Sequence, residues 1–119
     1  MSRDYYLADR TKYVPPGADY CLAVTDDCMS PAIRRGDVIY VSCTLPVEPM
    51  DAALFYHKGQ VICRQWCEDS TGAIHLLCAN PARESCNIRF APEERERCIC
   101  LGKVLLKKKL PAPVYTNTR

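Results

Sequence analysis

Apolar residues in this chain gather in short runs that are separated by turns rich in glycine, proline, asparagine and aspartate. Alternation and a high content of β-branched and aromatic residues are typical of strands. Gly59 lies between the runs 52–56 and 60–66 and predicts a β-hairpin. Gly102, inside the run 98–106, predicts a bulge or a close backbone approach. Strands are predicted at 19–24, 38–43, 52–56, 60–66, 73–78, 86–90 and 98–106. Helical periodicity is nearly absent, so we expect an all-β domain with a strongly bent sheet and few or no helices.

A polar turn precedes the second predicted strand. Pro31 fixes its own φ and removes a donor, so the segment 29–33 is expected to lie outside the sheet. Gly36 and Asp37 then form a turn before the strand begins. Cys28 is therefore placed on a bend at the mouth of the sheet, a position where folds often hold reactive groups.

The length of 119 residues fits one domain with a modest core. Residues 1–19 end in a Val-Pro-Pro-Gly cluster and are expected to be a leader or the remnant of a linker. We assign residues 20–110 to the domain and expect residues 111–119 to form a frayed C-terminal tail.

Composition excludes several classes of protein. No apolar run approaches the roughly 18 residues that a membrane span requires, and the N-terminus lacks a secretion signal. We therefore expect a cytoplasmic protein without membrane contact. The net charge of +2 is too small to favour nucleic-acid binding by the domain itself.

The nine cysteines are odd in number, and in a reducing compartment most are expected to be free thiols that pack as small hydrophobic residues.

Five blocks of sequence carry a resemblance to a known family. Residues 26–29 read Asp-Asp-Cys-Met, with a proline two positions later, and residues 50–55 read Met-Asp-Ala-Ala-Leu-Phe. Residues 61–66 read Val-Ile-Cys-Arg-Gln-Trp, residues 76–81 Leu-Leu-Cys-Ala-Asn-Pro, and residues 101–104 Leu-Gly-Lys-Val. In this order they resemble the LexA-like self-cleaving repressors and the related signal peptidases, where the first block reads Gly-Asp-Ser-Met.

The resemblance implies a partly barrel-like sheet of the LexA C-terminal type and a Ser-Lys catalytic dyad. The serine position is Cys28 and the lysine position is Cys63, so both catalytic groups are replaced by thiols. Met29, Pro31 and Arg64 are the residues expected to line the pocket. Because neighbouring strand residues point to opposite faces, we expect the side chain of Arg64 to face away from the dyad.

The family lysine acts as a general base once burial has lowered its pKa. Cys63 is no base at neutral pH, and a second thiol beside Cys28 raises the pKa of the first. The chain is therefore interpreted as a catalytically inactive domain that needs no cofactor. The resemblance implies a homodimer, formed through edge strands or the closing strand, that serves as the dimerisation and regulatory module of a phage-type transcriptional repressor. Such a repressor contacts DNA only through a helix-turn-helix domain, which these residues do not contain.

An active cysteine peptidase is the first alternative. Cys28 would be its nucleophile and would need a base or a nearby cation. His75 is the candidate base because its strand is expected to pair with the strand of the lysine position. His57 lies at the hairpin tip, about 20 Å along the strand from that position. Ser30 and Ser42 are weaker alternative nucleophiles.

A thiolate metal site is the second alternative. Cys28, Cys63 and Cys67 are its candidate ligands, and Cys98 and Cys100 share one strand face. Structural zinc sites usually have two Cys-x2–4-Cys knuckles, and only the pair 63 and 67 fits that spacing. A disulfide between Cys28 and Cys63 is conceivable if the two positions adjoin, although a reducing compartment opposes it.

Overall fold

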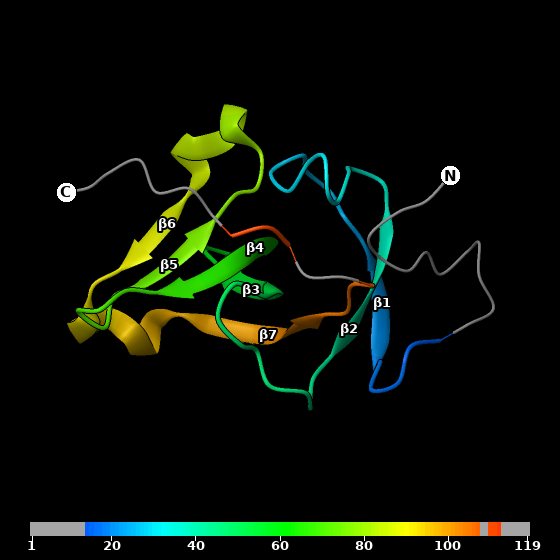
Figure 1. The fold of residues 1–119 in the computed structure, drawn as a ribbon, viewed down its shortest axis with the longest axis horizontal. Coiled ribbons are helices and arrows are strands. Elements are labelled where there is room, and N and C mark those ends of the chain that lie inside the picture. Colours follow the sequence, from blue (N-terminus) through cyan, green and yellow to red (C-terminus); the bar gives the residue numbers. More distant parts are fainter. Residues whose placement is uncertain (1–13, 108–109, 113–119) are drawn as a thin grey trace.

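The computed structural model describes residues 14–107 and 110–112. Seven antiparallel strands form one sheet in the order β1-β2-β7-β3-β4-β5-β6 (Figure 1). The strands are β1 (Tyr20–Ala23), β2 (Val38–Ser42), β3 (Ala52–His57), β4 (Gln60–Glu68), β5 (Ile74–Leu77), β6 (Ile88–Phe90) and β7 (Ile99–Val104). Two short 3-10 helices, η1 (Pro81–Cys86) and η2 (Pro92–Arg97), complete the described elements. The all-β prediction is confirmed, and the sheet is open, with β1 and β6 at its edges.

Each predicted strand is present within a few residues of its expected bounds. The hairpin of β3 and β4 turns at Lys58 and Gly59, both of which have positive φ. Helix η1 was not predicted. The Asn80 side chain starts it by accepting a hydrogen bond from the amide of Ala82 at 3.0 Å, and Pro81 supplies a fixed φ in its first turn.

Alternation along β3 divides the core between the two faces of the sheet. Ala52 and Leu54 belong to one buried cluster, together with Met29 and Cys63. Ala53 and Phe55 belong to a second cluster on the opposite face. Both faces of this central strand are therefore covered, which explains why its sequence is continuously apolar.

Gly102 lies where β7 passes β2 and β3. A Cβ atom there would lie 2.6 Å from Cγ1 of Val41 and 2.8 Å from the carbonyl oxygen of Ser42. The register between β3 and β7 also shifts between Leu54 and Phe55. The predicted bulge and close approach are both present.

The described residues that precede β1 and follow β7 are attached to the sheet by hydrogen bonds and by packing. The amide of Asp19 donates to the carbonyl of Val41 at 2.8 Å, and Leu110 is buried in the cluster that contains Cys63. Gln65 Nε2 donates to the carbonyl of Pro111 at 3.0 Å, where the chain crosses beside β4 (Figure 1). Most of the expected leader and tail lies outside the described residues, so the domain boundaries stay a prediction. Within the described residues, no helix is long and apolar enough to cross a bilayer.

Candidate functional site

The turn between β1 and β2 covers one face of the sheet and carries Cys28, the residue predicted to stand at the family serine position. Met29 and Ile33 have no exposed surface and anchor this turn in the core. The amide of Ile33 donates to the carbonyl of Met29 at 2.9 Å, so the segment is tightly wound. Cys28 is 4% exposed, whereas Pro31 points toward solvent. Met29 is thus packed in the core, and its side chain does not line an open pocket.

Three contacts clamp this turn to the segment that follows β5. The amide of Asn80 donates to the carbonyl of Cys28 at 2.9 Å, and Asn80 Nδ2 donates to the carbonyl of Asp27 at 2.9 Å. Arg83 Nε lies 2.8 Å from Asp27 Oδ1, and its hydrogen bond lowers the pKa of that carboxyl group. The backbone at position 28 is therefore held from a segment some fifty positions away along the chain.

The clamp brings the segment that carries Cys78, a thiol that the sequence did not single out, close to the turn that carries Cys28. Cys78 adds to the rise in the pKa of Cys28, whereas Cys28 opposes the rise in the pKa of Cys78 that burial causes. The sequence signal for this arrangement is the Leu-Cys-Ala-Asn-Pro block, whose cysteine has no role in the family resemblance. Cys78, and not only Cys63, is thus a thiol neighbour of the family serine position.

Arg64 is placed differently from the expectation. Its side chain is buried rather than turned away, and its Nη1 atom donates to the carbonyl of Cys63 at 2.8 Å. The same atom lies 3.7 Å from Asp26 Oδ2, and the charge of Arg64 lowers the pKa of both Cys28 and Cys63. Alternation fixes the direction of Cβ, but the long arginine side chain carries its guanidinium back to the dyad.

The two family dyad positions share one neighbourhood. Arg64, Asp26 and Cys78 each act electrostatically on Cys28 and on Cys63. Met29, which follows Cys28, also packs in the same cluster as Cys63. The turn that carries Cys28 therefore packs, through Met29, on the face of the sheet to which Cys63 belongs.

The protonation states of the two thiols follow from their burial. Burial raises the pKa of Cys28 to about 12, although the Arg64 charge opposes the shift and the Asp26 charge adds to it. Burial raises the pKa of Cys63 to about 12 as well. At pH 7 a thiol with such a pKa is ionised in roughly one molecule in 10⁵. Both groups are therefore neutral thiols near neutral pH.

The amide of Cys28 is also engaged. It donates to Asp26 Oδ1 at 3.1 Å, within the turn itself. Acyl transfer needs N–H donors that are free to receive the developing oxyanion, and the amide of the nucleophile is one of the usual donors. Here a carboxylate oxygen receives this donor and places negative charge where the oxyanion would form.

Two cavities lie in this region. Cys63 and Asp26 line a small pocket of about 70 Å³, well below the roughly 300–1,000 Å³ of ligand pockets. Cys78 and Gln65 line a larger, open cavity of about 500 Å³, whose wall includes residues 110–112. The base position thus has little room beside it, whereas Cys78 borders a space that small molecules can enter.

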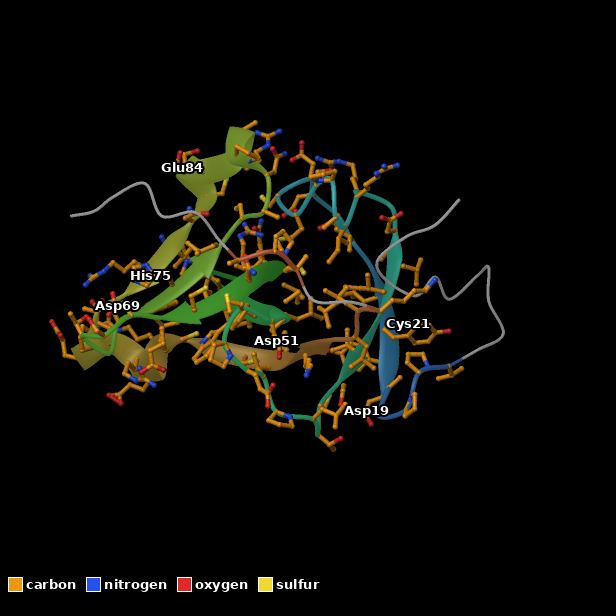
Figure 2. All side chains as sticks on the ribbon, viewed as in Figure 1. Asp19, Cys21, Asp51, Asp69, His75 and Glu84 are labelled. Carbon is orange, nitrogen blue, oxygen red and sulfur yellow. The ribbon has the colours of Figure 1, made fainter. Side chains whose placement is uncertain are left out.

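The candidate histidines have other partners. His75 Nε2 lies 2.8 Å from Asp69 Oδ2. Figure 2 shows both residues near one end of the long axis of the molecule, whereas Cys21 on β1 lies near the other end. His75 pairs across the sheet with Cys67, about 13 Å along β4 from the lysine position. The ring of His57 stacks edge-on against Phe90 with centroids 5.9 Å apart.

The remaining candidates do not form a reactive centre. The Ser42 hydroxyl is fully buried and accepts hydrogen bonds from the amides of Thr44 and Leu45. The amide of Ser30 donates to the carbonyl of Asp27 at 3.2 Å within the turn. In the part of the chain that the structure describes, no three cysteine, histidine or acidic side chains converge to hold a metal ion. The zinc alternative therefore has no ligand set there.

Comparison with known proteins agrees with this arrangement. A search of curated proteins finds no match. The family model described as Peptidase S24-like matches residues 2–105, which include all seven strands, Cys28 and Cys63. This match over most of the chain shows that the chain belongs to the Peptidase S24-like family.

Proposed function

We propose that this domain is a catalytically inactive member of its family that acts as a dimerisation and regulatory module of a transcriptional repressor. The observation that carries the proposal is the buried thiol of Cys63 at the base position, with its pKa raised to about 12. A group that stays protonated at neutral pH cannot take a proton from a nucleophile. The engaged amide of Cys28 and the small pocket beside Cys63 support the same reading.

A cleavage assay with matched variants tests the loss of activity. The wild-type chain is incubated from pH 6 to 9, alone and with a peptide library, and products are read by mass spectrometry. We expect the chain and the library to stay intact. Cleavage that disappears in a Cys28→Ala variant would contradict the proposal.

A triple variant, Asp26→Gly with Cys28→Ser and Cys63→Lys, asks whether the family geometry is retained. These changes restore the serine, the lysine and the glycine of the family pattern. Cleavage by this variant, but not by a matched variant with Cys63→Met in place of lysine, is the expected result.

An exposed apolar patch supports self-association. Tyr56 pairs with Val61 on β4 and with Ile99 on β7, so the three side chains are cross-strand neighbours. They are 46%, 45% and 49% exposed. Contiguous exposed apolar side chains mark interaction surfaces more often than scattered ones do. A second copy of the chain is the partner that we propose for this patch, and a separate DNA-binding domain would join the dimer to its operator.

Sedimentation velocity tests the dimer. We expect a mass of twice the 13.4 kDa of one chain. A Tyr56→Lys variant should shift the protein toward the monomer because it places charge in the apolar patch. Leu45→Lys is the matched control, since Leu45 is 40% exposed but lies outside the patch. A monomeric wild-type chain, or equal effects of the two variants, would contradict this interface.

An active cysteine peptidase is the second candidate, and one observation favours it. Arg64 is a buried cation whose charge lowers the pKa of Cys28, as a thiolate nucleophile requires. The desolvation of Cys28 outweighs that charge, because the pKa still lies near 12. The cleavage assay above decides between the two candidates.

A further inference from the structure

We propose that residues 110–112 form a strap that opens and closes over β3 and β4, and that its position controls access to this part of the sheet. The proposal goes beyond the proposed function and does not rest on it. Figure 1 shows the strap, in red, where it crosses beside β4.

One side chain holds the strap in the core. Leu110 is 8% exposed and belongs to the buried cluster that contains Ala52 and Cys63. Pro111 and Ala112 are exposed, and none of the three strap residues belongs to a strand. Because proline has no backbone N–H, position 111 cannot donate to a sheet ladder. The strap therefore lacks the ladder that fixes each strand, and segments of this kind open at a lower free energy than the whole fold does.

Gln65 fastens the strap to the sheet. This residue of β4 is 3% exposed, and its Nε2 atom donates to two carbonyl groups. One is the carbonyl of Met50 at 2.9 Å and the other is the carbonyl of Pro111 at 3.0 Å. A buried donor without a partner is costly, but water reaches this donor as soon as the strap leaves. The hydrogen bond to Pro111 therefore sets where the strap closes, and it adds little resistance to opening.

The strap covers one cross-strand pair. Ala52 on β3 and Gln65 on β4 lie directly opposite each other. Leu110 packs in the cluster of Ala52, and Pro111 accepts the hydrogen bond of Gln65. The pair is buried while the strap is closed, so opening of the strap exposes it to other molecules.

Leu110 also separates two cavities. Together with Gln65 and Asn80 it lines the open cavity of about 500 Å³, and together with Asp51 and Lys103 it lines a cavity of about 240 Å³. Space on two sides gives this side chain fewer packing partners than a leucine that is surrounded by other side chains. When the strap opens, the two cavities join into one groove that runs from Lys103 to Asn80.

Hydrogen exchange of the glutamine side chains, measured by NMR on the full chain, tests the strap. The chain has two glutamines, and the exposed Gln60 is the internal reference. We expect the side-chain amide of Gln65 to exchange at least tenfold more slowly than that of Gln60, at a rate that low urea hardly changes. The backbone amides of β3 and β4 should exchange faster as urea is added, because their exposure requires a larger part of the fold to open. An equal urea dependence for Gln65 and for these backbone amides would overturn the proposal, since the strap would then open only with the whole fold.

Two leucine variants separate opening of the strap from a general loss of stability. Leu110 and Leu105 are both 8% exposed, but Leu105 lines neither cavity. Leu110→Ser should raise the exchange rate of the Gln65 side chain at least tenfold relative to the backbone amides of β5. Leu105→Ser should leave this ratio unchanged. An unchanged ratio in Leu110→Ser, or equal effects of the two variants, would overturn the proposal. Leu110→Ala and Leu105→Ala give the same comparison where a serine variant does not fold.

Discussion

At the scale of single residues, the proposed loss of activity depends on three positions. Cys63 stands at the predicted base position and keeps its proton. Cys28 stands at the predicted nucleophile position and is held as a thiol by burial. Asp26 stands at the predicted glycine position of the family pattern and occupies the amide of Cys28. Under the proposed function, each change alone would slow acyl transfer, and together they would remove the base, the nucleophile and the binding of the oxyanion.

Met50 shows a departure of another kind. It lies just before β3 and has a φ of 74°, which L-residues rarely adopt. Met50→Gly should relieve about 1 kcal/mol or more of strain, which the greater freedom of glycine in the unfolded chain partly offsets. We expect a net stabilisation of up to about 1 kcal/mol in urea unfolding. Met50→Ala should bring no gain, and equal effects of both variants would argue against strain.

At the scale of elements, local pattern predicted the strands well and the contacts between segments poorly. Alternation and turn residues located all seven strands, the β3-β4 hairpin and the bulge at Gly102. The docking of the segment after β5 on the turn that carries Cys28 was missed, because it depends on hydrogen bonds of Asn80 to a turn that is distant in the sequence. The predicted direction of the Arg64 side chain was wrong. Strand alternation fixes the direction of the Cα–Cβ bond, but it does not fix where the end of a long side chain lies.

Gly102 offers a test of how β7 packs between β2 and β3. Gly102→Ala would place a methyl group within 2.8 Å of the carbonyl oxygen of Ser42, a backbone atom that cannot move independently. We expect a loss of about 1–3 kcal/mol in the free energy of unfolding. Cys100→Ala, an exposed position on the same strand, should change that free energy little. An unchanged unfolding midpoint in the glycine variant would mean that the two strands lie further apart.

At the scale of the whole molecule, the buried thiols couple stability to alkaline pH. Their pKa in the fold is about 12, against an ordinary value of 9.0, so the folded chain retains protons that the unfolded chain loses. The stability that they contribute is complete below about pH 9 and is lost as the pH rises toward 12. The free energy of unfolding, measured by urea titration, should therefore fall over this window by at most about 1.4 kcal/mol per pH unit for each thiol. Cys63→Val should make the fall shallower, and identical profiles would contradict the burial of that thiol.

The rate at which Cys28 is alkylated tests the central claim, a pocket without an activated nucleophile, most directly. Iodoacetamide labelling of the folded chain is followed from pH 6 to 9 by mass spectrometry of the Cys28 peptide, with the exposed Cys86 as internal reference. We expect slow labelling whose rate rises about tenfold per pH unit across the whole range, because only the rare thiolate reacts. Fast labelling of Cys28 that is independent of pH between 6 and 8 would show a stable thiolate, and the pocket would then hold an activated nucleophile.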